Sequence, residues 1–135
     1  MIPSIVEIRE RLTPLFQDEG LQFVLLFGSI ASGKGNKQSD TDLGFLFDKP
    51  VDIVDLTNKI IRLLHFDDVD VVDLRRASPT LKFFAAKYGK VLFERSPGLF
   101  HEFYSLTFRR YIDTKKIRDA QSRTIQHFLE EKGLR

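Results

Sequence analysis

The chain has 135 residues, of which 42% are apolar and 30% charged, and it contains no cysteine. A chain of this length favours a single domain and buries roughly two-thirds of its unfolded surface, so it needs no covalent cross-links to fold. The lack of cysteine excludes disulfides, thiolate metal sites, iron–sulfur clusters and cysteine nucleophiles. The first residues mix acids and arginines with apolar side chains, which predicts neither a signal peptide nor a membrane span, and therefore a cytoplasmic protein.

Charge is distributed unevenly along the chain, although the net charge is only +2. Residues 1–74 carry 7 basic and 13 acidic side chains, whereas residues 75–135 carry 14 and 6. This asymmetry predicts an acidic pocket for cations beside a basic region suited to phosphates, RNA or an acidic partner. A second interpretation, in which the basic helices are simply solvated, stays open.

The first elements follow from the spacing of apolar residues. From Ile5 to Phe16 the spacing is helical, which predicts a helix that runs to about Glu19 and is closed by Gly20. The continuous apolar run over 21–28 predicts a strand buried on both faces. The following elements are, in chain order, a strand over 40–48, a turn at 48–50, a helix over 52–65, a strand over 69–74, a helix over 79–88 and a short edge strand over 90–94.

A last helical tract begins at Ser96 and Pro97 and ends near Lys132, with a break predicted around Asp113 and Thr114. The tract mixes aromatic and aliphatic residues with arginines, and it holds more apolar surface than one stripe against a small sheet needs. We therefore expect it to be the chief surface for a partner or for a dimer. The alternative is that the helix simply covers the open face of the sheet.

Aromatic and histidine residues outside the predicted site have plainer interpretations. Two groups of phenylalanines are expected to pack in the core or between helices, with base stacking as the alternative: Phe83 with Phe84, and Phe100 with Phe103 and Phe108. His65, His101 and His127 have no paired spacing and are expected to be surface residues without a metal.

The segment from Gly28 to Asp42 carries the most specific pattern: Gly-Ser, ten residues, then Asp-x-Asp. Gly28 lets the backbone approach a ligand closely, and Ser29 with the following amides offers donors to phosphate oxygens. Asp40 and Asp42 are two residues apart in an extended chain, so they point to one face and repel unless a cation lies between them. Hard oxygen ligands of this kind suit Mg²⁺ bridged to the phosphates of a nucleotide.

A third carboxylate is expected from the strand over 69–74, which contains Asp70 and Asp73. Their odd separation puts them on opposite faces of a regular strand, so only one can serve. We favour Asp70, because it lies near the end of the strand where a neighbour could align it with the Asp pair. Asp73 is the alternative, and Asp67 and Asp68 are expected in a loop.

Together these residues resemble the DNA polymerase beta-like nucleotidyltransferase superfamily, and the short chain with GSIASG and SDTDLG resembles its minimal nucleotidyltransferase branch. The resemblance covers residues 21 to about 95. It implies an α/β fold with a small mixed sheet flanked by helices. Residues 1–95 would form the catalytic domain and residues 96–135 a C-terminal helical extension packed on it, in one compact unit.

The resemblance also implies roles for the motif residues. Gly28 and Ser29 would hold the triphosphate of ATP, and Asp40, Asp42 and Asp70 would bind Mg²⁺, with two ions expected. Asp70 would also help to activate the attacking hydroxyl. Many relatives carry an arginine in the turn after Gly-Ser, where this chain has Ala31, Ser32 and Gly33, and Lys34 or Lys37 is the candidate for the missing positive charge.

Minimal nucleotidyltransferases are commonly paired with a HEPN-domain protein as antitoxin and toxin, and some transfer AMP from ATP to a tyrosine of that toxin. The resemblance therefore implies an ATP-dependent protein adenylyltransferase that acts as an antitoxin. Two alternatives stay open: an antitoxin that neutralises its partner by binding alone, and a nucleotidyltransferase that acts on RNA or a small molecule. The chain is also compatible with a homo-oligomer and with contact to RNA, but not with membrane insertion.

Overall fold

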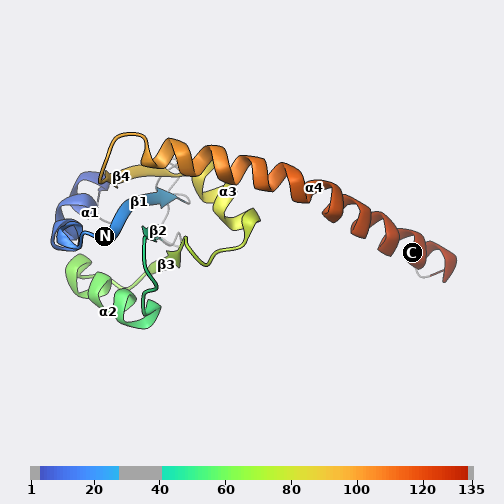
Figure 1. Ribbon diagram of the computed structural model, residues 1–135. Helices are drawn as coiled ribbons and strands as arrows, with labels where there is room; N and C mark the ends of the chain where they lie inside the picture. The colour runs from blue at the N-terminus through green and yellow to red at the C-terminus, as the bar shows by residue number, and fades with distance from the viewer. Residues whose placement is uncertain (1–3, 28–40, 134–135) are drawn as a thin grey trace.

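A computed structural model describes residues 4–27 and 41–133, which form one four-stranded sheet between two layers of helices (Figure 1). In chain order the elements are α1 (Ile5–Leu12), the 3-10 helix η1 (Thr13–Gln17), β1 (Leu21–Phe27), β2 (Thr41–Phe47), α2 (Ile53–Leu64), β3 (Val69–Asp73), α3 (Pro79–Tyr88), β4 (Lys90–Glu94) and α4 (Leu99–Glu131). The strand order is β3-β2-β1-β4. β1 is antiparallel to β2 and β4, whereas β2 and β3 are parallel, so the sheet is mixed and β4 is an edge strand as predicted.

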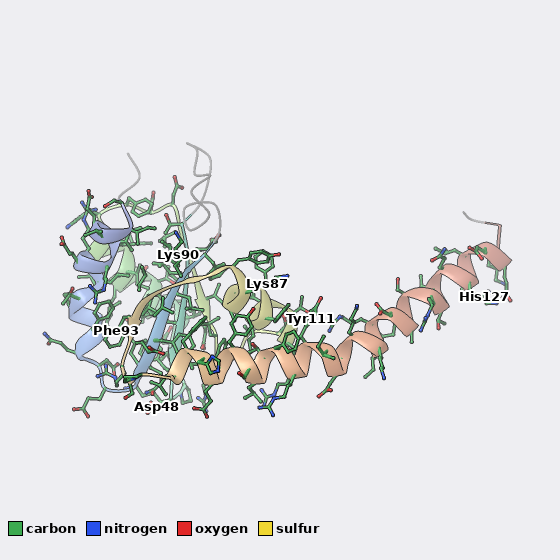
Figure 2. All side chains as sticks on the ribbon, turned by 90° about the horizontal axis from the view of Figure 1, so that it is seen from above. Asp48, Lys87, Lys90, Phe93, Tyr111 and His127 are labelled. Atoms are coloured by element: carbon green, nitrogen blue, oxygen red, sulfur yellow. The ribbon has the colours of Figure 1, made fainter. Side chains whose placement is uncertain are left out.

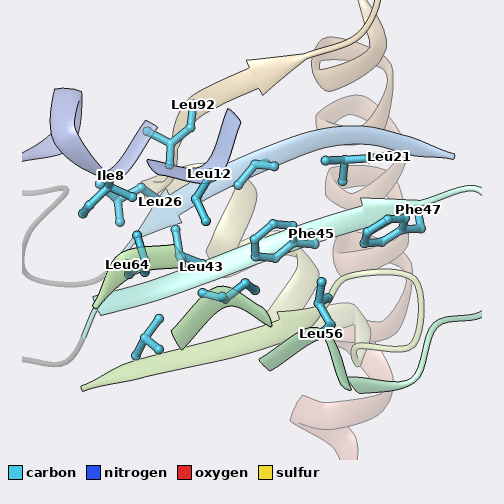
Figure 3. Close-up of a cluster of buried hydrophobic side chains, with 13 residues drawn as sticks. Ile8, Leu12, Leu21, Leu26, Leu43, Phe45, Phe47, Leu56, Leu64 and Leu92 are labelled. Atoms are coloured by element: carbon cyan, nitrogen blue, oxygen red, sulfur yellow. The ribbon is translucent and has the colours of Figure 1, made fainter. Parts of the chain in front are cut away.

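One face of the sheet is covered by α1 and α2. Ile8 and Leu12 of α1 and Leu64 of α2 are fully buried against Leu43 and Phe45 of β2 (Figure 3). Burial of side chains of this size stabilises the fold by about 1.5–3 kcal/mol each. This face is therefore the larger and more completely closed part of the core.

The other face is covered by α3 and the first part of α4. Phe23 of β1 is fully buried there, with the ring of Phe100 at 5.8 Å and 90° and that of Phe103 at 5.1 Å and 68°. These edge-to-face contacts add about 0.5–1.5 kcal/mol each beyond the burial itself. They fix the start of α4 across β1, while α3 packs on β1 and α4, and Leu74 of the preceding loop packs on Gly44 of β2.

Helix starts match their sequence signals. The Ser78 hydroxyl accepts a hydrogen bond of 3.2 Å from the Leu81 N–H, and Pro79 occupies the first helical position of α3. The Asp52 carboxylate caps α2 in the same way, accepting from the N–H groups of Val54 and Asp55.

The first predicted helix was too long. The α-helix α1 ends at Leu12, and the 3-10 helix η1 follows it to Gln17, whereas one continuous helix to Glu19 was predicted. Pro14 explains the change, because its ring removes a backbone donor and clashes with the carbonyl four residues earlier, at Glu10.

The predicted break near Asp113 and Thr114 is also wrong, because α4 is continuous through both residues. The Thr114 hydroxyl donates a hydrogen bond of 3.1 Å to the Arg110 carbonyl, so it bonds within the helix instead of ending it. The Arg118 guanidinium lies over the Tyr111 ring, 4.4 Å from its centre, and so connects the helical turn after Thr114 to the turn before it.

The two halves of α4 have different surroundings. Its first half packs on α3, where Phe83 stacks on Tyr111 at 4.4 Å and 21°. Beyond Tyr111 the helix projects away from the sheet, and His127 lies far out on this projection (Figures 1 and 2). Ile117, Ile125 and Phe128 are 59%, 61% and 53% exposed there. Covering the sheet therefore accounts for the first half only. None of the helices in the described ranges is long and apolar enough to span a bilayer.

Candidate active site

Asp42 and Asp70 lie side by side on neighbouring strands. In the parallel pairing of β2 and β3, Asp42 is the register partner of Asp70, and in the antiparallel pairing of β1 and β2 it is the partner of Phe27. Register partners point to the same face of a sheet. Phe27, Asp42 and Asp70 therefore form one row across three strands, with both carboxylates at its β2–β3 end.

The face on which this row lies follows from its neighbours. Gly44, the next same-face residue of β2, packs under Leu74, whose Cδ1 atom would lie 3.0 Å from a Cβ at Gly44. Leu46 and Val72, which continue the same two columns, pack with Leu74 and Ala85. The carboxylates thus lie on the face covered by α3 and α4, where Asp42 is half-buried and Asp70 exposed.

Asp73 is arranged differently. It pairs with Phe45, and its strand neighbours Val69 and Val71 pack in the core on the α1–α2 face. Its carboxylate accepts a hydrogen bond of 3.1 Å from the Arg75 N–H and thereby stabilises the turn after β3. The register brings Asp70, and not Asp73, to the partner position of Asp42.

Several residues of the predicted site lie outside the described residues: Gly28, Ser29, Lys34 and Asp40, with Ala31, Ser32, Gly33 and Lys37. The described residue next to Asp40 is Thr41, whose N–H donates a hydrogen bond of 3.0 Å to the Asp68 carbonyl. That bond fixes the start of β2 against the exposed Asp67–Asp68 loop and so aligns Asp42 with Asp70. Within 4–27 and 41–133, no group of three or more histidine or acidic side chains is placed to hold a metal ion.

The histidines take no part in this arrangement. His65 ends α2 with a left-handed backbone (φ 62°), and His127 pairs with Glu131 at 3.0 Å on the projecting part of α4.

A basic group that the sequence reasoning did not single out lies on α3. Lys82 is half-buried, and its pKa is lowered, first by burial and then by the nearby positive charge of Arg110, while Asp73 opposes this shift. The signal available in the sequence was the position of Lys82 between apolar residues on a helix that must cover a sheet.

The two neighbouring phenylalanines in the middle of α3 have different surroundings. Phe83 packs on α4 as predicted, but Phe84 is half exposed, so the prediction of a packing role is wrong for Phe84. Adjacent helical residues differ by about 100° in direction, and this difference could have separated the two.

Residues 10–98 match the family model described as polymerase beta, nucleotidyltransferase. This match covers most of the chain and includes all four strands with the Asp42–Asp70 pair. The chain therefore belongs to the polymerase beta nucleotidyltransferase family, and it is a nucleotidyltransferase. The predicted fold class is confirmed.

The individual relatives are more specific. The chain is 30% identical over 146 residues to the protein adenylyltransferase MntA of Aphanizomenon flos-aquae (strain 2012/KM1/D3), a match that covers 98% of this chain and 97% of the relative. A crystal structure of a toxin–antitoxin with AMP-PNP contains a similar chain, with a TM-score of 0.77, 28% identity, and coverage of 92% of this chain and 99% of that one. A structure of tri-AMPylated Shewanella oneidensis HEPN toxin with MNT antitoxin contains another, with a TM-score of 0.73, 26% identity, and coverage of 90% and 98%. The predicted resemblance to minimal nucleotidyltransferases is confirmed.

Proposed function

We propose that this nucleotidyltransferase is an antitoxin that transfers AMP from ATP to a tyrosine of a HEPN-domain toxin in the cytoplasm, with Mg²⁺ as its cofactor. The observation that carries the proposal is the register of Asp42 with Asp70 on one face of the sheet, in a chain similar over nearly its whole length to a protein adenylyltransferase. The relatives found with a HEPN toxin or with AMP-PNP support the partner and the nucleotide.

The residues present fit a magnesium site. Asp42 and Asp70 offer carboxylate oxygens from adjacent strands, and Asp40 is two residues from Asp42 in the sequence. Two acidic side chains so arranged repel each other unless a cation is bound, and oxygen ligands suit Mg²⁺. Bound there, as one or two ions, Mg²⁺ would neutralise charge on the phosphates during transfer.

The chain's own residues would divide the remaining work. Gly28, Ser29 and Lys34 would bind the triphosphate and hold the α-phosphate at the carboxylates. Asp70 would orient the acceptor hydroxyl and take its proton, while the hydroxyl oxygen attacks the α-phosphorus and pyrophosphate leaves. The exposure of Asp70 supports this role, because the acceptor must reach it from solvent.

The acceptor protein needs a docking surface outside the carboxylate row, and the projecting half of α4 supports that role. We assign catalysis to residues 1–95 and docking, to the toxin or to a second copy, to the helical extension over 96–135. Ile117, Ile125 and Phe128 are exposed on this extension, and together they form what we name the distal stripe of α4.

The test is incubation of the purified chain with Mg²⁺ and labelled ATP, with and without the product of the adjacent gene as the candidate HEPN-domain toxin. Label transferred to a tyrosine of the toxin supports the proposal. Neutralisation of the toxin without transfer would identify an antitoxin that acts by binding alone. Transfer to RNA or to a small molecule would contradict the proposed acceptor, an outcome for which the basic residues 75–135 are the motive.

A further inference from the structure

Helix α3 has one side that neither the sheet nor α4 covers. Ala85 is fully buried against the sheet, and Phe83 faces α4. Because a helix turns by about 100° per residue, Phe84 and Tyr88 lie together on a third side, away from α4. Their rings are 4.8 Å apart and inclined at 51°, and the two residues are 49% and 55% exposed.

This side of α3 ends beside the row that holds the carboxylates. Gly89 directly follows Tyr88, and a Cβ at Gly89 would lie 3.4 Å from the Cβ of Leu25. Leu25 pairs with Gly44, and the next same-face pair along the strands is Phe27 with Asp42. Since same-face positions are about 7 Å apart along a strand, the C-terminal end of α3 lies one such step from the row of Asp42 and Asp70.

The exposed side also carries a cation. The Lys87 ammonium nitrogen is 5.3 Å from the centre of the Tyr88 ring, at the end of α3 near which β4 begins with Lys90 (Figure 2). Two neighbouring, half-exposed rings and an adjacent amino group match the chemistry of a purine, which has a flat π-face and ring nitrogens that accept hydrogen bonds.

We propose that Phe84 and Tyr88 form a stacking platform for the purine base of the donor nucleotide. The inference rests on the proposed function, because it takes the phosphates of that nucleotide to lie at Asp42 and Asp70. The two half-exposed rings lie beside an ammonium group and one step from the carboxylate row, which favours the base of the nucleotide over the acceptor as their occupant. Stacking is tolerant of the base, so the platform would supply affinity for purine nucleotides in general.

The experiment compares two ligands that share the phosphates but not the base. Binding of ATP and of inorganic tripolyphosphate, each with Mg²⁺, is measured by calorimetry for the wild-type chain and for the double variant Phe84→Ala/Tyr88→Ala. We expect the double variant to bind ATP about tenfold more weakly and tripolyphosphate as the wild type does. Tyr88→Phe should bind ATP like the wild type, because stacking needs the ring and not the hydroxyl.

Val54→Ala is the control, since it removes an exposed apolar side chain from α2, which covers the opposite face of the sheet. Unchanged ATP affinity in the double variant, or an equal loss of tripolyphosphate binding, would overturn the platform and leave the proposed function intact. So would unchanged ATP affinity accompanied by a raised KM for the acceptor. Failure of the wild-type chain to bind ATP would overturn the proposed function as well.

Discussion

The carboxylate end of the sheet and the projecting half of α4 differ in how they are held. Asp42 is fixed by strand pairing on both sides, to Phe27 and to Asp70, so its position follows from the backbone of three strands. The distal stripe, by contrast, lies on a helix that leaves the sheet and carries its apolar residues into solvent (Figure 1). Rigid placement suits a reaction, whereas exposed apolar area suits binding.

Because the two regions are held independently, we expect that substitutions can abolish nucleotide transfer or association separately. A helix without tertiary contacts is marginal in water, so the projecting half gains stability when a partner covers its stripe. Substitutions at the carboxylates should therefore change activity without changing assembly, and substitutions on the stripe should do the reverse.

The largest expected effect is at the Asp pair. Asp42→Asn or Asp40→Asn should lower nucleotide transfer by about a hundredfold or more, because a carboxylate that binds the metal and offsets phosphate charge is lost. Transfer is measured with labelled ATP, and unfolding by urea serves as the control for the fold. Full retained activity, or unfolding of the variants, would contradict the assignment.

A second test separates the two candidate carboxylates of β3. Asp70→Asn should reduce the rate at least as much as Ser29→Ala, since Ser29 supplies one phosphate donor among several while Asp70 also orients the acceptor. Asp73→Asn should stay near the wild-type rate, because its carboxylate bonds to the Arg75 N–H in the turn and Asn keeps that acceptor. A large loss of rate in Asp73→Asn and a near wild-type rate in Asp70→Asn would assign the third carboxylate to Asp73 and contradict this prediction.

A third prediction concerns the distal stripe of α4. Ile125→Lys with Phe128→Lys should weaken association with the toxin, or of two copies, by at least about tenfold, because aromatic and aliphatic residues at an interface centre carry most of its energy. Association is measured by ultracentrifugation with and without the toxin, and ATP binding serves as the control. Loss of ATP binding with unchanged association would show that the stripe serves the nucleotide site.

Charge reversal of Arg109 and Arg110 tests the same helix nearer to the body. Because both are exposed on α4, their reversal should weaken association and leave the chain folded and able to bind Mg-ATP. The positive charge of Arg110 contributes to the lowered pKa of the half-buried Lys82. Charge reversal at Arg110 should therefore also raise the pKa of Lys82, which titration by NMR can follow. If ATP binding is lost instead, these arginines belong to the nucleotide site.

The sequence was sufficient wherever periodicity alone decides the structure. The alternation in β3 separated Asp70 from Asp73, and the Ser78–Pro79 signal located the start of α3. It was insufficient where the outcome depends on what a residue touches. The apolar spacing of α4 predicted an apolar face but could not show that α3 and the sheet cover only its first half.

The two errors in helix length have local causes. Pro14 indicates an early end of α1, but the apolar spacing continues past it to Phe16 and predicts a longer helix than the structure has. At Thr114 the polar residues predicted a break, but a threonine hydroxyl can also bond to the helix carbonyl four residues back, and composition does not decide between the two.

The smallest expected effect lies at Asp18, next to the start of β1 and thus at the end of the sheet opposite the carboxylate row. Its carboxylate accepts hydrogen bonds from the Gly20 N–H at 2.9 Å and from Lys49 at 3.1 Å, which hold its pKa below the ordinary value of 3.8. A lowered pKa contributes stability that is fully present above 3.8 and is lost as the pH falls through the lowered value. Because the side chain is 41% exposed, solvent screens the pair, and Asp18→Asn should cost only about half a kcal/mol at neutral pH. Urea unfolding of the wild type and of Asp18→Asn between pH 2 and pH 6 should show this difference shrinking toward the acid end, while transfer and association stay unchanged. A difference independent of pH would mean that packing, and not the charge, makes Asp18 stabilising, and the exposed Asp119→Asn is the control for a general effect of charge.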